Sequence, residues 1–292
     1  MSDILNIVLP TFLVILIGYI FGRTRKLDIS PVVDVAFYLG LPAVAFVSIL
    51  DKKIVLLDAT KVWASAIIIM LGCGIIAWLV FKILKQKHSG LYLPIVVMNT
   101  VNIPFPVIYL AYGSEGLLAA TLFYIPVVLV MFSFGIYVAS GKHWRVSLKQ
   151  MLSVPTLYAA IIGLLLNFAN VAVPKLIIEP LSLISQMAIP LVLLILGYNL
   201  SKIRLTALPT TVLASVLRLG VGLLLGLLVV KLFNLTGILM AVVILDSAMP
   251  AAANVALLAT KYENESELVS SVVLVTTIAC LVIIPFLLYM LR

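Results

Sequence analysis

Long apolar runs are the feature of this sequence that most restricts its fold. Residues 61–84 carry Lys only near their two ends, and almost every residue between them is apolar. An α-helix rises about 1.5 Å per residue, so about 20 such residues cross the hydrocarbon core of a bilayer. The sequence contains ten runs of this kind. We predict membrane-spanning helices over residues 4–22, 31–50, 61–84, 91–112, 117–139, 153–169, 176–200, 209–232, 237–261 and 267–291.

Composition excludes a soluble fold. Hydrophobic residues make up 64% of the chain and charged residues 10%, whereas a soluble domain has about 45–50% apolar and about 25% charged residues. A transmembrane β-barrel would alternate apolar and polar residues, and the run from Ala66 to Val80 shows no such alternation. We therefore predict an all-α integral membrane protein that crosses a cell membrane, inner or plasma, many times.

The connections between the runs are too short for a folded aqueous domain, so any activity must lie within the helical bundle. No predicted helix contains a His, and the sequence shows no metal-ligand spacing and no Ser–His pairing. We therefore expect no enzyme, no catalytic residue, no cofactor and no bound metal. Cys73 and Cys280 are predicted to be small packing residues.

Lys and Arg are distributed unevenly between the two sides of the predicted membrane. The first, third, fifth and seventh connections, with the helix ends beside them, carry eleven of them: Arg23, Arg25, Lys26, Lys82, Lys85, Lys87, Lys142, Arg145, Lys149, Lys202 and Arg204. The ninth is weaker evidence, with Lys261 beside Glu263, Glu265 and Glu267. The even-numbered connections carry five: Lys52, Lys53, Lys61, Lys175 and Lys231. Because short basic loops face the cytoplasm, we predict a cytoplasmic loop over 141–152 and both termini outside. The net charge of +8 thus indicates contact with anionic lipid and no nucleic acid.

The basic loop 141–152 divides the chain into two halves, 1–140 and 153–292, with five predicted helices each. An odd number of helices reverses the second half in the membrane, so related halves would form an inverted repeat. Pro104 and Pro250 are each the fourteenth residue of a predicted helix, in 91–112 and 237–261. This correspondence favours a 5+5 inverted repeat whose fourth and ninth helices are broken.

A proline inside a helix removes one backbone hydrogen bond, so Pro104 is predicted to free the carbonyl of Thr100, and Pro250 that of Asp246. An unwound helix at mid-membrane presents N–H groups that bind anions and carbonyls that bind cations. The alternative is that both prolines only bend their helices. The polar neighbours favour the unwound form, because polar groups at that depth are costly without partners. The candidate substrate-binding residues are Asn99, Thr100, Asn102, Pro104, Pro250 and Asn254.

Arg218 and Asp246 are the two charges predicted to lie deep in the membrane. Such residues commonly mark ion or substrate pathways. One interpretation is a fixed Arg218–Asp246 ion pair. The other is ion coupling, in which Asp246 binds a proton or Na⁺ and Arg218 balances the charge.

Two segments resemble a known family. Asn99-Thr-Val-Asn-Ile-Pro-Phe-Pro106, followed by Ala111-Tyr-Gly113, and Asp246-Ser-Ala-Met-Pro-Ala-Ala-Ala-Asn254, followed by Ala259-Thr-Lys-Tyr262, are similar to the two helix crossovers of the auxin efflux carrier family. The family includes bacterial malonate and malate permeases and plant auxin exporters. This chain departs from it in the run Val101-Asn102-Ile103, where members often carry glycines.

The resemblance implies a 5+5 inverted repeat in which one part of the bundle moves against the other, as in an elevator. Helices 4–22, 31–50, 153–169 and 176–200 would form the scaffold, and homodimers would form through 31–50 and 176–200. Substrate carboxylates would bind where the broken helices cross, near Asn99, Asn102, Pro104 and Pro250.

These observations lead to one hypothesis and two alternatives. We expect a secondary active transporter of a small organic anion, a carboxylate such as malate or malonate, that works by alternating access. Its driving force would be a proton or Na⁺ gradient, or the membrane potential. The alternatives are a carrier of a neutral or cationic solute on the same fold, and a channel or sensor without turnover.

Overall fold

The computed structural model describes residues 2–141, 149 and 152–291, so most of the predicted loop 141–152 lies outside the described residues. The described part is helical and contains no β-strand, only one isolated bridge between two residues. Seven helices are long and apolar enough to cross a membrane: Ile4–Thr24, Ser30–Asp51, Leu56–Ile83, Pro104–Ser140, Lys175–Leu200, Leu208–Leu232 and Ser266–Met290. Two shorter apolar helices accompany them, Pro155–Phe168 and Gly237–Ser247.

In the first half, the helices lie close to the predicted ranges 4–22, 31–50 and 61–84, whereas the predicted ranges 91–112 and 117–139 give one short helix and one long helical run, Pro104–Ser140. The elements are α1 (Ser2–Thr24), α2 (Ser30–Val35), the π-helical turn η1 (Ala36–Gly40), α3 (Leu41–Asp51), α4 (Leu56–Ile83), α5 (Tyr92–Val96), α6 (Pro104–Val130), η2 (Met131–Gly135) and α7 (Ile136–Ser140). α4 begins before the predicted residue 61, with Asp58 in its first turn, where a carboxylate suits the helix dipole. Within α6, Gly113 takes a positive φ of 63° and separates two helical stretches.

The second half is also helical. Its elements are α9 (Pro155–Phe168), α10 (Lys175–Leu200), α11 (Leu208–Val216), η3 (Leu217–Val221), α12 (Gly222–Leu232), α13 (Gly237–Ser247), α14 (Ala253–Lys261) and α15 (Ser266–Met290). Helix is absent from residues 97–103 and from residues 248–252. Both predicted helix breaks are therefore present, because α5 stops before α6 begins and α13 stops before α14 begins.

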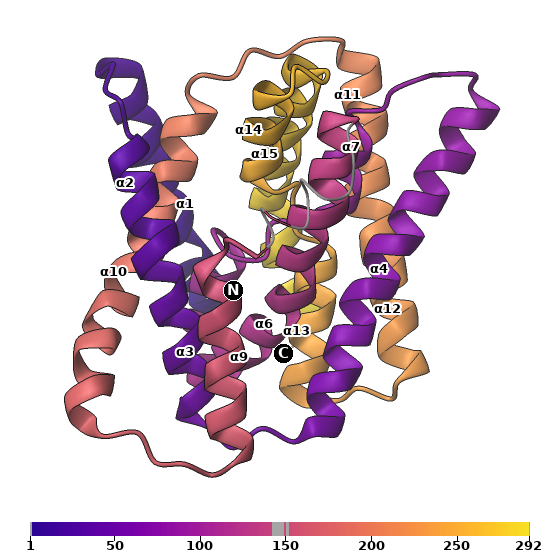
Figure 1. Cartoon of the computed structure of the whole chain (residues 1–292). Coiled ribbons are helices and arrows are strands. Elements are labelled where there is room, and N and C mark those ends of the chain that lie inside the picture. Colours follow the sequence, from indigo (N-terminus) through magenta and orange to yellow (C-terminus); the bar gives the residue numbers. More distant parts are fainter. Residues whose placement is uncertain (1, 142–148, 150–151, 292) are drawn as a thin grey trace.

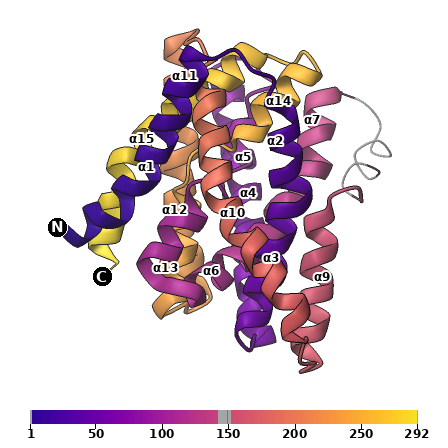
Figure 2. The ribbon, with the colours of Figure 1, turned by 90° about the vertical axis from the view of Figure 1, so that its left-hand side faces the viewer.

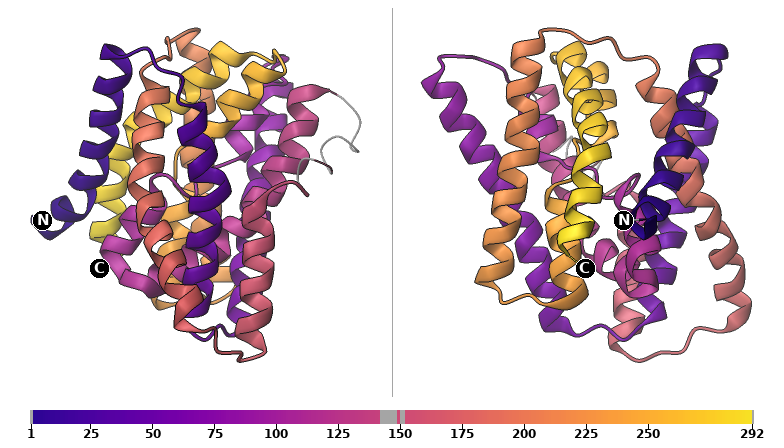
Figure 3. Two further views of the ribbon diagram at one scale, coloured as in Figure 1. Left: turned by 60° about the vertical axis from the view of Figure 1, so that its left-hand side comes forward. Right: turned by 180° about the vertical axis from the view of Figure 1, so that it is seen from behind.

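Two groups of helices lie side by side in the bundle. One group packs α1 against α10, and α3 against both α9 and α10; the other packs α4 against α6 and α12, and α15 against α11 and α14. Figures 1 and 3 show α1, α2 and α10 on one side of the molecule and α4 and α12 on the other. α1 begins near the point where α15 ends (Figure 2). Glycines bring α1 and α10 close, since a Cβ added at Gly197 would overlap the carbonyl of Ile15.

The connections at each end of the bundle are held together by hydrogen bonds. At the upper end of Figure 1, the side chain of Lys202 donates to the carbonyl of Gly22, and His88 contacts Glu265 at 2.6 Å. At the lower end, Asn167 donates to the carbonyls of Ile49 and Lys52. The connections between α1 and α2, α4 and α5, and α10 and α11 therefore share the upper end, which we call the basic end because it carries most of the Lys and Arg residues that the structure describes.

Candidate functional site

The two helix breaks meet and pair through their main chains. Met98 and Ala251 form an antiparallel bridge. The amide of Asn99 donates to the carbonyl of Pro250 at 2.7 Å, and the amide of Ala252 donates to the carbonyl of Val97 at 3.0 Å. Backbone groups left over by the breaks thus satisfy one another, which lipid cannot do. We call residues 97–103 and 248–252 together the crossover.

Both prolines lie at positions where the missing N–H costs little folding free energy. Pro104 opens α6, and at the first position of a helix the missing N–H needs no partner. Pro250 lies outside any helix, and its own carbonyl is an acceptor in the bridge. The prediction that Pro250 frees the carbonyl of Asp246 is wrong, because that carbonyl accepts the amide of Met249 at 3.2 Å. Because the chain turns immediately after α13, the carbonyl of Asp246 is hydrogen-bonded within that turn.

Asn99 organises the first break. Its side-chain Oδ1 accepts the amide of Asn102 at 2.9 Å and that of Val101 at 3.3 Å. Asn99 is only 4% exposed. Its Nδ2 is buried and has no hydrogen-bond partner among the described residues. A buried amide donor without a partner is costly in a protein interior, so Asn99 presents a donor that a bound group would satisfy.

Four of the six predicted substrate-binding residues line one small cavity. A cavity of about 30 Å³ beside the crossover is lined by Asn99, Thr100 and Asn102 from one break and by Asn254 at the start of α14. Pro104 and Pro250 are buried at the crossover but do not line this cavity. α6 and α14 both start at the crossover, and each helix dipole places partial positive charge there. At α6, Pro104 and Pro106 carry no N–H, and the amides of Phe105 and Val107 donate to the carbonyls of Val101 and Ile103. The N–H groups left for a ligand are therefore those at the start of α14.

An apolar vestibule adjoins this cavity on the side of the basic end. It has a volume of about 260 Å³ and shares Phe37, Tyr124, Met131 and Asn254 with the cavity. Its wall continues to Lys261 at the end of α14. Phe37 and Tyr124 were not among the predicted residues. Only the folded chain brings them together, since they come from different helix groups.

Asp246 lies in the last turn of α13 and is completely buried (0% exposed). Neither of its carboxylate oxygens has a hydrogen-bond partner among the described residues.

Thr276 in α15 stabilises the bridge between the two helix breaks. Its hydroxyl accepts a hydrogen bond from the amide of Ala251 at 3.2 Å. Thr276 was not predicted as a site residue, since a Thr within an apolar run carries no distinguishing signal.

Arg218 does not pair with Asp246 in the part of the chain that the structure describes, where the two ion pairs are Lys52–Glu115 and His88–Glu265. Its guanidinium instead donates to two main-chain carbonyls, Nη1 to Ile95 at 3.0 Å and Nη2 to Ser247 at 2.6 Å. The interpretation as a fixed ion pair is therefore wrong. Arg218 binds the last turn of α5 and the last residue of α13, the two half-helices that end at the crossover.

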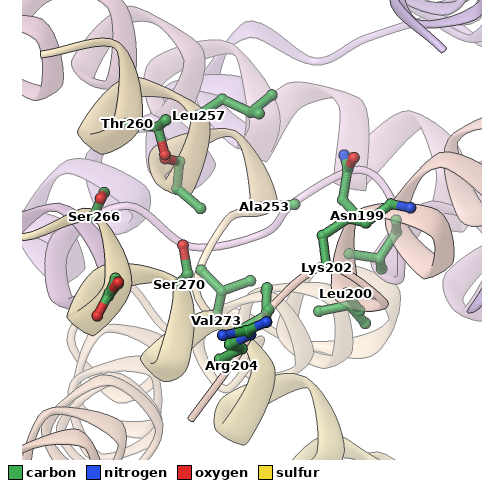
Figure 4. A pocket seen from close by; sticks show the side chains of 14 residues that line it. Asn199, Leu200, Lys202, Arg204, Ala253, Leu257, Thr260, Ser266, Ser270 and Val273 are labelled. Carbon is green, nitrogen blue, oxygen red and sulfur yellow. The ribbon is translucent and has the colours of Figure 1, made fainter. Parts of the chain in front are cut away.

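A second concave region faces the basic end. This pocket, of about 380 Å³, runs from Ala253 at the start of α14 to Thr260 and Ser266 at the basic end. Figure 4 shows Asn199 at the end of α10 and Lys202 just after it on one side of the pocket, and Ser266 and Ser270 on the other. It therefore separates the helix group of α10 from that of α14 and α15.

Comparisons with known proteins all point to membrane transport. A family model described as "Membrane transport protein" matches residues 142–288. An uncharacterized transporter of Methanocaldococcus jannaschii is 27% identical, with 96% of each chain covered. An uncharacterized transporter of Methanothermobacter thermautotrophicus is also 27% identical, with 95% of each chain covered.

Proposed function

The chain belongs to the membrane transport protein family, that of the auxin efflux carriers, and on this premise we propose that it is a secondary transporter of a small organic anion. The family is one of transporters and not of enzymes. The substrate class we propose is a carboxylate, of the kind represented by malate and malonate. The substrate would bind at the crossover.

The observation that carries this proposal is the unpartnered Nδ2 of Asn99 beside two helix N-termini. α6 and α14 begin at the crossover from opposite halves of the chain. Their dipoles and the first N–H groups of α14 favour an anion, and the buried Nδ2 of Asn99 adds a neutral donor. Neutral donors suit a carrier, because a transported anion must also leave the site.

The proposed architecture is ten spans in a 5+5 inverted repeat, with 1–140 and 153–292 as the repeats. Reading α5 with the start of α6, and α13 with α14, as two broken spans supports this count. The antiparallel pairing of the two breaks agrees with a two-fold relation between the halves. Alternating access would then come from an elevator-like movement of the α4–α6 and α11–α15 group against the α1, α3, α9 and α10 group.

Coupling and membrane placement belong to the same proposal. Asp246 would carry a proton or Na⁺, since it is an unpartnered carboxylate next to the crossover. The basic end would face the cytoplasm of a plasma or inner membrane, with both termini outside. Homodimers would form through 31–50 and 176–200.

Thermal shift of the purified protein tests the substrate class. The probes are a panel of mono- and dicarboxylates, with matched amines and neutral solutes, each with and without Na⁺ and at two pH values. We expect one or more carboxylates to raise the melting temperature (Tm), because a ligand that binds only the folded state stabilises it. Reconstituted protein should then show saturable counter-flow of the same carboxylate.

Each contrary result selects an alternative. Stabilisation by amines or neutral solutes, with none by any carboxylate, would overturn the anion class and favour a different solute on this fold. Flux without saturation and without counter-flow would favour a channel.

A further inference from the structure

Arg218 holds the ends of both broken helices at once. Its side chain is completely buried (0% exposed). One guanidinium nitrogen donates to Ile95 in α5 and another to Ser247 at the end of α13. These two helices come from different halves of the chain. A single side chain thus links the two carboxyl ends that face the crossover.

The guanidinium of Arg218 fits between α12 and α13 because residue 222 is a glycine. A Cβ added at Gly222 would overlap both the guanidinium of Arg218 and the carbonyl of Ser247. One turn later, a Cβ added at Gly226 would overlap the side chain of Ser247. The pair Gly222 and Gly226 therefore lets α13 approach α12 closely, as small residues do between membrane helices.

The charges at this point balance without a second ion. A helix carboxyl end carries about −0.5 of an elementary charge. α13 supplies such an end and the shorter α5 adds to it, so the two together offset much of the single charge of Arg218. In transporters with broken helices, these carboxyl ends and their carbonyls are where a coupling cation such as Na⁺ is coordinated.

We infer that Arg218 is the resident cation of the crossover: its guanidinium joins the carboxyl ends of α5 and α13 and occupies the position that a metal cation would take. This inference rests on the proposed transport function and deepens it. Arg218 is a positioning residue, because it acts on the helices and not on the substrate. Na⁺ bound to these carbonyls is thereby excluded as the coupling ion.

The test uses cation binding and needs no substrate. The purified full-length protein is measured by ²²Na⁺ scintillation proximity and by Tm in NaCl, choline chloride and low-millimolar guanidinium chloride. We expect no saturable ²²Na⁺ binding at the carbonyls of Ile95 and Ser247 while Arg218 is present. Any ²²Na⁺ binding by the wild type should therefore be lost in Asp246→Asn, and the Tm of that variant should be the same in NaCl and choline chloride. Arg218→Ala should lose several degrees of Tm, recover most of this loss in guanidinium, and gain saturable ²²Na⁺ binding that guanidinium displaces.

A second variant keeps the test decisive if Arg218→Ala does not fold. Gly222→Ala leaves the charge in the chain but displaces the guanidinium, so we expect a lower Tm. Gly220→Ala is the matched control on the adjoining turn, because the nearest atom to its added Cβ is 4.0 Å away. Saturable ²²Na⁺ binding that persists in Asp246→Asn while Arg218 is present, or a wild-type Tm in both Arg218→Ala and Gly222→Ala, overturns the inference. Failure of carboxylate binding alone leaves these readouts unchanged and counts only against the proposed function.

Discussion

The amide of Asn99 and the carbonyl of Pro250 lie 2.7 Å apart, although the two residues come from opposite halves of the chain. With the reciprocal bond from Ala252 to Val97, this contact joins the two helix breaks through main-chain atoms alone. Side chains around the bridge, such as those of Asn99 and Asn102, are thereby positioned by the backbone.

Substitution of Asn99 separates its structural role from its binding role. Asn99→Asp keeps an oxygen that accepts the amides of Val101 and Asn102, so the protein should remain folded. The added negative charge should repel an anion, so carboxylate-induced stabilisation should disappear. Asn99→Ala should lose the same response and also about 1 kcal/mol per lost hydrogen bond. Thermal shift with malonate measures both effects, and an undiminished malonate response in Asn99→Asp would remove Asn99 from the site.

Asn102→Ala should weaken carboxylate binding without unfolding the protein. The side chain lines the crossover cavity, and only its backbone amide takes part in the hydrogen bonds of the turn. We expect the concentration of carboxylate needed for half-maximal thermal shift to rise about tenfold, which corresponds to about 1.4 kcal/mol. Asn6→Ala, at an exposed position in α1, is the control and should behave as wild type. The same half-maximal carboxylate concentration in both variants would contradict the assignment of Asn102 to the site.

Asp246→Asn tests whether Asp246 couples transport to a proton or Na⁺ gradient. The amide has nearly the shape of the acid but carries no titratable group, and the carboxylate oxygens that it replaces have no partner among the described residues. We expect counter-flow of a carboxylate to persist in proteoliposomes, while accumulation driven by a pH gradient is lost. If the wild type instead responds to a Na⁺ gradient and the variant does not, Asp246 carries Na⁺. An unchanged response of the variant to both gradients would exclude Asp246 as the coupling group.

Two adjacent threonines in α15 provide a matched pair. The hydroxyl of Thr276 accepts the amide of Ala251 in the bridge at 3.2 Å, so Thr276→Val should leave that buried N–H unsatisfied at a cost of about 1–3 kcal/mol. The hydroxyl of Thr277 is buried without a partner among the described residues, so Thr277→Val should leave stability unchanged or raise it. Tm values of the two variants compare them directly. A larger loss in Thr277→Val would contradict this account of the bridge.

Much of the fold follows from patterns that single segments carry. An apolar run such as 61–84 predicts a membrane helix because lipid permits few other structures. The segment 99–104 predicts an interruption, because Asn99, Asn102 and Pro104 each disfavour a continuous apolar helix. Such signals are local, so they can be read before the chain is folded.

The partners of the buried charges could not be predicted in the same way. Electrostatic reasoning offers Asp246 as the partner of Arg218, yet the guanidinium donates to the carbonyls of Ile95 and Ser247. These carbonyls become available only where two helices end, and backbone carbonyls do not differ from residue to residue in a sequence. The space for Arg218 likewise depends on Gly222, whose role appears only when α12 meets α13.

The main-chain bridge between Met98 and Ala251 also bears on how such a protein evolves. A joint made of amides and carbonyls keeps its geometry when most side chains around it are replaced. The residues that face the cavity can therefore change in polarity and size while the joint between the two helix breaks stays the same. New cargo becomes accessible through a few point mutations, in keeping with the general rule that one fold serves many functions through changes at its site.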